Sequence, residues 1–406
     1  MNKIEGGVTV AQGFKAAGIY AGIKKKKKDM ALIYSTVPAV SAGTFTTNLV
    51  KAAPVLWDLK LIKERETAQA VVLNSGVANA CTGEEGEKNN YKMALAVANA
   101  LNIPVETVLT ASTGVIGQQM PIKVIEEGSK ILADSLEDSL IGGLLAAEAI
   151  MTTDTYAKEC AVTFQIGDTT VTLGGMAKGS GMIHPNMATM LGVVTTDLAI
   201  TKELLQEALS ADVKDSFNMV SVDRDTSTND SLILLANGQA GNPVITEKNE
   251  DYLTFCKALH FVTTELAKKM AADGEGANKL FECIVYGAKD KEQAVSLSKS
   301  IITSNLVKTA ICGNDANWGR ILCAMGYAGV EFDPYKVDLF IESSAGKLKL
   351  VEDGMATAYD EEFATKILSQ KEVRASADIK MGNYSATAWG CDLTYDYIKI
   401  NGDYRS

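Results

Sequence analysis

The sequence is poor in the residue types on which several common catalytic sites depend. Its 406 residues include only two histidines, His184 and His260, and its seven cysteines form no C-x-x-C pair. A histidine base for a serine or cysteine nucleophile therefore has few places to occur, and there is no G-x-S-x-G turn or H-E-x-x-H helix. Because no cysteine and histidine residues have the spacing of zinc ligands, we expect no metal site.

Long apolar runs, secretion signals and net positive charge are also missing. The longest apolar run is far shorter than the roughly 20 residues that span a bilayer, and the N-terminal stretch lacks a signal-peptide core. The odd, widely spaced cysteines are expected to be reduced and to act as small core residues. With a net charge of −11, the chain is an unsuitable partner for nucleic acids or anionic membranes. These absences predict a cytoplasmic globular protein.

One basic run stands against the acidic background, at residues 24–28, which read KKKKK. Because neighbouring like charges repel one another, we expect these lysines to form a solvated loop between two strands. The alternative is a patch that binds anions.

The chain is long enough to bury a large core, and its length predicts two domains or lobes. Apolar patterning predicts strands at 30–36, 68–76 and 188–197 and a hairpin at 160–175. Helical periodicity predicts helices at 87–101, 121–136, 140–151, 201–217, 252–272, 292–304 and 318–325. Residues 394–401, TYDYIKIN, are expected to end a closing hairpin, and a second α/β unit is expected to begin near residue 280.

The most unusual segment is GGMAKGSGMIHPNMATML, residues 174–191. A threonine hydroxyl is a poor nucleophile, but an α-amino group with a pKa of about 7.7–8.0 can serve as the base for its own residue's hydroxyl. An internal threonine gains such an amine only if the chain cuts itself just before it, by attack of the hydroxyl on the preceding carbonyl. A small preceding residue and flexible glycines ease the strained turn that this attack needs, so Ala188-Thr189 fits. The alternative is that this pair belongs to an ordinary strand.

The same segment resembles the self-cleavage segment of the ornithine acetyltransferase family, the glutamate N-acetyltransferases of arginine biosynthesis. Further sequence motifs similar to those of the family occur in order along the chain: LNSGVANACTGEEG, STGVIG, MTTDT, STNDS, DGEGA, GNDANWGRI and AWGCDLTYDYIKIN. The resemblance implies a mixed α/β (α+β) fold, the αββα sandwich shared with certain self-processing aminopeptidases. It places this catalytic core in residues 1–280 and a smaller C-terminal α/β domain, which completes the substrate site, in residues 281–406.

The resemblance also assigns roles to individual residues. It places the nucleophile on Thr189, freed by cleavage after Ala188, so that an α chain (1–188) and a β chain (189–406) result. The oxyanion stabilisers fall on Thr113 and Gly114. Contacts to substrate fall on Thr152, Lys178, Thr189, Glu275, Asn401 and Ser406. Lys178 suits a carboxylate and Glu275 an ammonium group, whereas His184 is expected to support the turn before the cleavage point.

The activity implied by the resemblance is transfer of an acetyl group from N-acetylornithine to glutamate through an acetyl-Thr189 ester, in the cyclic arginine pathway. The resemblance implies no cofactor, and it implies that two cleaved copies of the chain assemble as α2β2. Many family members also accept acetyl-CoA as an acetyl donor. Whether this protein uses one donor or both is left open by the sequence. Two alternatives are a self-processed aminopeptidase or amidase of the same fold, and a catalytically silent amino-acid-binding protein.

Overall fold

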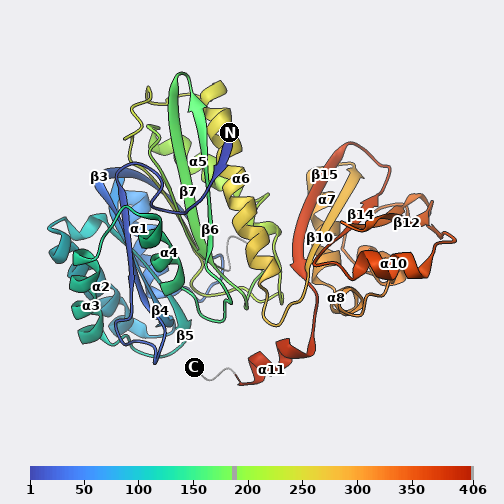
Figure 1. The fold of residues 1–406 in the computed structure, drawn as a ribbon, viewed down its shortest axis with the longest axis horizontal. Helices are drawn as coiled ribbons and strands as arrows, with labels where there is room; N and C mark the ends of the chain where they lie inside the picture. The colour runs from blue at the N-terminus through green and yellow to red at the C-terminus, as the bar shows by residue number, and fades with distance from the viewer. Residues whose placement is uncertain (185–189, 404–406) are drawn as a thin grey trace.

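The computed structural model describes residues 1–184 and 190–403, whose strands form two sheets, one of nine strands and one of six (Figure 1). The nine-stranded sheet has the order β1-β6-β7-β8-β9-β3-β4-β5, with β2 paired to β3. Its strands are β1 (Asn2–Ile4), β2 (Phe14–Ile19), β3 (Met30–Phe45), β4 (Thr67–Val77), β5 (Val108–Val115), β6 (Lys158–Ile166), β7 (Thr169–Lys178), β8 (Leu191–Thr196) and β9 (Ser231–Ala236).

The long strand β3 folds this sheet over on itself. Its first part, from Met30 to Tyr34, pairs with β2 and β4, whereas its last part, from Val40 to Phe45, pairs with β9. The register shifts between Tyr34 and Ala39, around Pro38. Proline lacks an N–H donor and interrupts the ladder of hydrogen bonds. One half of the sheet therefore turns to face the other half.

The two halves enclose one hydrophobic cluster and are each covered by helices on the outside. Along β4, Val71 and Leu73 point inward and share a cluster with Val193 of β8 and Ile233 of β9, while Val72 points outward. This alternation is the pattern of a strand buried on both faces. The helices of this region are α1 (Ala53–Glu64), α2 (Gly83–Leu101), α3 (Ile122–Asp134), α4 (Leu140–Ala149), α5 (Lys202–Asp212) and α6 (Glu250–Ala272).

These helices complete four layers, so the expected αββα sandwich is confirmed. Helices α2 and α3 cover the β2-β3-β4-β5 half, and α5 and α6 cover the half that contains β6 to β9. Helices α1 and α4 contribute to the cluster between the halves. A short one-turn helix, η1 (Val105–Thr107), precedes β5, and another, η2 (Phe217–Met219), follows α5.

The second sheet has the order β13-β12-β11-β14-β10-β15. Its strands are β10 (Leu280–Ala288), β11 (Asp338–Ser343), β12 (Gly346–Glu352), β13 (Met355–Ala356), β14 (Glu372–Asp378) and β15 (Tyr384–Cys391), and its helices are α7 (Lys291–Thr303), α8 (Asn305–Cys312), α9 (Trp318–Gly326), η3 (Pro334–Lys336) and α10 (Glu361–Leu368). One hydrophobic cluster joins Leu266 and Met270 of α6 to Phe281 and Trp389 of this sheet. The division of the chain near residue 280 stays a prediction.

The C-terminal segment differs from its expected form. Tyr395–Asp403 is a helix, α11, rather than the last strand of a hairpin, and it runs below both sheets (Figure 1). Tyr395 and Ile398 are three residues apart, as are Tyr397 and Ile400, so the apolar pattern fits a helix face as well as a strand. Tyr395 and Ile398 are 93% and 69% exposed, so burial does not select a strand here.

The other expected helices and strands are present, but β3 continues nine residues beyond the expected end at 36, and the helix expected at 201–217 ends at Asp212. All seven cysteines are free thiols, but only Cys160, Cys283 and Cys391 are buried. Cys81 and Cys323 are exposed, so the expectation that all cysteines are core residues was wrong. No helix in residues 1–184 and 190–403 is long and apolar enough to cross a bilayer.

Candidate active site

A cavity of about 410 Å³ lies where the ends of the two sheet halves meet. Its wall combines the C-terminal ends of β5 and β7, the start of β8, the residues before β9, and parts of the segments after α4 and α6. The predicted site residues that the structure describes all line it: Thr113, Gly114, Thr152, Lys178, Glu275 and Asn401. Their roles stay predictions, but five separate segments of the chain bring these six residues together.

Three predicted residues, Ala188, Thr189 and Ser406, lie outside the described residues. The residues on either side of the predicted cleavage point are described. Met190, which follows Thr189, is 3% exposed and lines the cavity. Lys178 pairs with Leu191 at the end of β7 and the start of β8, so the intervening segment leaves and rejoins the sheet at the cavity wall.

Thr113 and Gly114 form the exit of β5 at this wall. Gly114 has φ of +130°, in the region that favours glycine, and a Cβ added there would come within 2.3 Å of the carbonyl carbon of Gly76. Glycine at this position therefore allows the chain to leave β5 in close contact with the end of β4. The exit is held further by Asn229, whose side-chain amide donates to the carbonyl oxygens of Ala78 and Ser112 at 2.6 and 2.9 Å.

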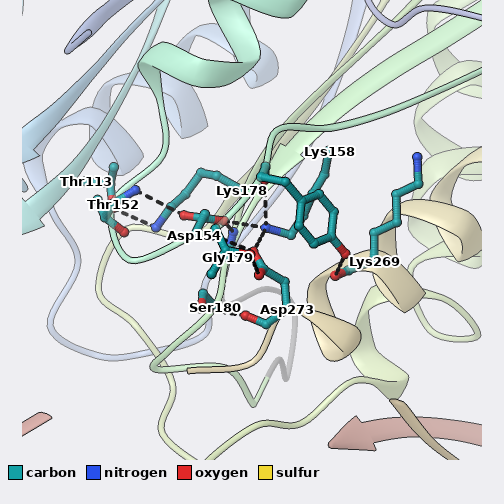
Figure 2. Close-up of polar contacts among 11 residues, drawn as sticks. Thr113, Thr152, Asp154, Lys158, Lys178, Gly179, Ser180, Lys269 and Asp273 are labelled. Carbon is teal, nitrogen blue, oxygen red and sulfur yellow. Dashed lines mark hydrogen bonds and ion pairs between the residues drawn. The ribbon is translucent and has the colours of Figure 1, made fainter. Parts of the chain in front are cut away.

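Lys178 sets the direction in which the Thr113 hydroxyl can donate. Its Nζ atom donates a hydrogen bond of 3.1 Å to Thr113 Oγ1 (Figure 2). Because the hydroxyl oxygen accepts this bond, its own proton remains free to be donated into the cavity. Burial lowers the pKa of Lys178, while the nearby carboxylates of Asp154, Asp230 and Glu275 act in the opposite direction.

Behind Lys178 lies a set of three buried charges, Asp154, Lys158 and Asp273, which we call the buried charge network. Lys158 Nζ lies 2.7 Å from Asp154 Oδ1 and 2.6 Å from Asp273 Oδ2, and the Lys158 side chain has no exposed surface (Figure 2). Burial raises the pKa of Asp154, but Lys178 and Lys158 outweigh it and hold that pKa at about 2. Asp154 is therefore a carboxylate at neutral pH, as is required to balance the two lysines.

The buried charge network also fixes backbone segments that form the cavity wall. The carboxylate of Asp154 accepts hydrogen bonds from the backbone N–H groups of Thr152 at 3.0 Å and of Gly179 at 2.8 Å. Ser180 Oγ donates to the Asp273 carbonyl oxygen at 2.6 Å. These bonds connect the segment after α4, the segment after β7 and the end of α6, so the buried charges position three parts of one wall.

Glu275 and Asn401 meet at another part of the wall. Glu275 is 8% exposed, and its Oε2 accepts a hydrogen bond of 2.7 Å from Asn401 Nδ2. Helix α11 is attached nearby through Thr394 Oγ1, which donates to the carbonyl oxygen of Gly276 at 2.7 Å, and through Tyr397, which donates to Asp223 at 3.3 Å. The C-terminal helix therefore contributes directly to the cavity.

Asp230 is a lining residue that we did not anticipate from the sequence. It is 2% exposed, and burial raises its pKa well above the usual range despite hydrogen bonding and the nearby Lys178. Among the described residues nothing donates to its Oδ2 atom. Burial therefore favours the protonated form of this side chain, which lies one residue before β9, the strand that pairs with β8.

His184 has the structural surroundings of a supporting residue. Its Nδ1 lies 3.0 Å from Ser221 Oγ, and its carbonyl oxygen accepts a hydrogen bond of 2.9 Å from Thr226 Oγ1. Burial lowers its pKa to about 4, with Lys299 and Arg224 acting in the same direction. The ring is neutral at pH 7, and its role in supporting the turn before the cleavage point stays a prediction.

The residues missed by sequence reasoning carry no local pattern that marks them. Asp154, Asp230 and Asp273 lie in the words MTTDT, STNDS and DGEGA, which supported the family resemblance without roles for these residues. Lys158 opens a strand, where an isolated lysine ordinarily reaches solvent. The contact between Lys158 and Asp273 joins segments 115 residues apart, so no local pattern could predict it.

The arrangement is suited to acyl chemistry on a small amino-acid derivative. A hydroxyl with a free proton and a tight backbone turn can stabilise a developing oxyanion. A buried lysine can bind a carboxylate, and a buried glutamate can bind an ammonium group. The cavity volume is in the range of sites for small metabolites.

Comparison with known proteins identifies the family of this chain. The model of the ArgJ family matches residues 15–406. An arginine biosynthesis bifunctional protein, ArgJ 1 of Clostridium acetobutylicum, is 53% identical over 404 residues, covering 98% of this chain and 97% of that protein. The ArgJ protein of Thermotoga neapolitana is 49% identical over 398 residues, covering 98% of this chain and all of that protein.

A solved structure of an ArgJ protein is also similar to this chain. The crystal structure of the arginine biosynthesis bifunctional protein argJ from Bacillus halodurans is 45% identical, with a TM-score of 0.50. The match covers 98% of that chain but 52% of this one. The resemblance found in the sequence is confirmed by these matches, and the chain belongs to the ArgJ family.

Proposed function

We propose that this protein transfers an acetyl group from N-acetylornithine to glutamate through an acetyl ester on Thr189. The observation that carries the proposal is the cavity itself. It brings Thr113 and Gly114, Lys178, and the Glu275–Asn401 pair to one wall, and it is lined by Met190, the residue bonded to Thr189.

In the first half-reaction, the Thr189 hydroxyl oxygen attacks the acetyl carbonyl carbon of N-acetylornithine. The carbon–nitrogen bond breaks, and the hydroxyl proton passes through the Thr189 α-amino group to the departing ornithine nitrogen. Thr113 and Gly114 stabilise the negative charge on the carbonyl oxygen as it develops. In the second half-reaction, the amine nitrogen of glutamate attacks the ester carbonyl carbon and the carbon–oxygen bond to Thr189 breaks. A proton from the amine passes through the α-amino group to the Thr189 oxygen, and N-acetylglutamate leaves.

The charges in the cavity account for the two amino acids. Ornithine and glutamate share an α-carboxylate, which Lys178 binds in both half-reactions together with contacts from Thr152. Their side chains carry opposite charges, so Glu275, held by Asn401, favours the ornithine ammonium group. Ser406 is assigned a substrate contact from the resemblance alone.

The reaction requires no metal or redox cofactor, because the nucleophile, base and oxyanion donors all come from the chain. Acetyl-CoA is proposed as a second donor, and the relatives' description as bifunctional supports this. Cleavage into two chains that assemble as α2β2 is part of the same proposal. The half-length match to the Bacillus halodurans chain fits a family member that exists as two shorter chains.

The proposal is tested by the distribution of products. The enzyme is incubated with N-acetylornithine, with and without glutamate, and ornithine, N-acetylglutamate and free acetate are measured. We expect ornithine and N-acetylglutamate in equal amounts and little acetate, because a well-positioned amine can have an effective concentration of about 10⁵ M or more and so outcompetes water. Double-reciprocal plots should give parallel lines. Acetate equal to ornithine, whether or not glutamate is present, would identify a hydrolase of the aminopeptidase or amidase kind. An absence of turnover would favour the silent amino-acid-binding protein.

Thr113→Ala tests the oxyanion role. We expect kcat to fall about 100-fold or more, with little change in stability, because the hydroxyl donor acts mainly on the transition state. Steady-state kinetics with N-acetylornithine and glutamate measure the effect, and Thr113→Ser, which keeps the hydroxyl, is the matched control. A rise in KM with kcat unchanged would instead assign Thr113 to substrate binding.

A further inference from the structure

The five lysines of residues 24–28, which we call the lysine loop, connect β2 to β3 in a fixed conformation. Asp29 follows the loop and is fully buried. Its carboxylate accepts hydrogen bonds from the backbone N–H groups of Ala21 at 2.7 Å, Gly22 at 3.1 Å and Lys24 at 2.8 Å. The loop is thus a solvated connection between two strands, as expected, but it is anchored at its base rather than loosely extended.

The sheet places this loop beside the cavity. Met30 pairs with Asn74, and Asn74 pairs with Ser112, the residue before Thr113. The strands β3, β4 and β5 lie side by side in Figure 1, so the turn before Met30 lies at the same end of the sheet as the exit of β5. The register alone therefore brings the lysine loop to the level of the candidate active site.

Lys24 also contacts the segments that form the cavity wall. A Cβ added to Gly76 would lie 3.0 Å from Lys24 Cγ, and Gly76 in turn packs against Gly114 of the cavity wall. On the other side, Lys24 Nζ donates a hydrogen bond of 2.9 Å to the carbonyl oxygen of Met151, the residue before Thr152. Lys24 therefore spans two segments of the cavity wall from behind.

The loop also carries positive charge, most of which forms no ion pair within residues 1–184 and 190–403. Lys28 forms an exposed ion pair of 2.9 Å with Glu148. Lys25, Lys26 and Lys27 are exposed, and their side chains take part in no ion pair with the residues that the structure describes. Burial lowers the pKa of Lys24 to about 8, and Lys27 and Lys178 act in the same direction against Asp29, so a bound anion would be favourable here. In a chain of net charge −11 this concentration of lysines is a local exception.

We propose that the lysine loop binds the phosphate groups of a second acetyl donor, a thioester whose carrier bears several phosphates. The acetyl end enters the cavity, while the carrier extends over the rim past Gly76 to the exposed ammonium groups. Several clustered ammonium groups suit a multiply charged phosphate ligand, with which they form charge-assisted hydrogen bonds. This inference rests on the proposed function and assigns a binding site to a donor of that class.

The chemical step is the same as with N-acetylornithine. The Thr189 hydroxyl oxygen attacks the thioester carbonyl carbon, the carbon–sulfur bond breaks, and the hydroxyl proton passes through the α-amino group to the departing thiolate. The products are the acetyl ester and the free thiol of the carrier. The lysines take no part in this step and contribute only to binding and to the rate of encounter.

The test compares three acetyl donors in wild type and in the triple variant Lys25→Ala/Lys26→Ala/Lys27→Ala, with glutamate as acceptor. The donors are acetyl-CoA, N,S-diacetylcysteamine, which is a thioester without phosphate, and N-acetylornithine. We expect kcat/KM for acetyl-CoA to fall about tenfold in the variant, while the other two donors change by less than about twofold. In wild type, added salt should lower kcat/KM for acetyl-CoA alone, because exposed charges are screened.

The matched control removes the same amount of charge elsewhere. Lys60, Lys63 and Lys257 are exposed and do not line the cavity, so their triple alanine variant should use acetyl-CoA like wild type. Equal losses for acetyl-CoA and N,S-diacetylcysteamine, or no loss for either, would overturn the site. If wild type uses N-acetylornithine but releases no CoA from acetyl-CoA, the inference about the lysine loop fails together with the proposed second donor, and the proposed transfer from N-acetylornithine to glutamate stands. If N-acetylornithine is not used either, the proposed function fails.

Discussion

Thr189→Ala should leave the chain intact at its full 406 residues, whereas the wild-type chain should separate without added protease into fragments 1–188 and 189–406. The reason is chemical. The hydroxyl oxygen of Thr189 attacks the Ala188 carbonyl carbon in an N-to-O acyl shift that breaks the carbon–nitrogen bond, and water then hydrolyses the resulting ester. The alanine side chain of the variant has no hydroxyl that could make this attack. The same variant should show no acetyl transfer, because it lacks both the hydroxyl and the free α-amine. Denaturing mass spectrometry of the purified proteins measures the first effect, and the product assay measures the second.

The structure anchors the residues on both sides of the predicted cleavage point. The backbone N–H groups of Met182 and Ile183 donate to the Asp223 carboxylate at 2.7 and 2.8 Å. On the other side, the carbonyl oxygen of Met190 accepts a hydrogen bond of 2.9 Å from the backbone N–H of Ser231. The described residues that flank the predicted cleavage point are thus held to the cavity region by backbone hydrogen bonds.

Thr189→Ser is the matched control, because it retains a hydroxyl at the same position. It should still cleave at the same bond, because the serine hydroxyl can make the same attack, and it should keep measurable transfer activity. A wild-type chain that is intact, folded and active would contradict the mechanism, and so would cleavage of Thr189→Ala at the same bond.

The fold was largely predictable from the sequence, because its signals are local or belong to long motifs. Apolar alternation located β4 and the β6–β7 hairpin, and helical periodicity located α2 and α6. What patterning could not supply is the path of β3. The register shift around Pro38, which turns one sheet into two facing layers, depends on which strands pair with each part of β3. Helix α11 was mistaken for a strand because its few apolar residues are mostly exposed and fit both periods.

The candidate site divides in the same way. The residues on its wall, such as Thr113 and Lys178, lie in motifs that the sequence displays. The residues behind the wall do not, because the buried Lys158 is balanced by one nearby carboxylate, Asp154, and by a second, Asp273, that arrives from a distant segment. Likewise, the raised pKa of Asp230 follows from its burial, which no local pattern encodes.

Lys158→Met should lower the free energy of unfolding by about 3–5 kcal/mol, because it leaves Asp154 and Asp273 buried without their shared cation. The measurement is urea unfolding in the uncleaved Thr189→Ala background, where a single chain unfolds. Lys248→Met is the matched control, since Lys248 forms an ion pair with Glu207 in which both side chains are about half exposed. This control should change stability by less than about 1 kcal/mol. A loss for Lys158→Met no larger than that of the control would contradict a structural role for the buried charge network.

The pH dependence of this loss separates charge imbalance from simple loss of packing. In the native protein the pKa of Asp154 is held at about 2, below its ordinary value of 3.8, so its ionisation stabilises the fold above pH 3.8 and that contribution is lost as the pH falls toward 2. Removing Lys158 eliminates both a charge and a hydrogen bond that lower this pKa, so burial, which raises it, becomes dominant. A folded-state pKa above the ordinary value reverses the sign of the contribution of Asp154, and the destabilisation then grows as the pH rises.

Lowering the pH from 7 to 5 should therefore narrow the difference in the free energy of unfolding between Lys158→Met and its parent. Adding Asp154→Asn should recover part of the stability at pH 7. If the loss is the same at both pH values and Asp154→Asn recovers nothing, Lys158 acts through the packing of its aliphatic chain rather than through its charge.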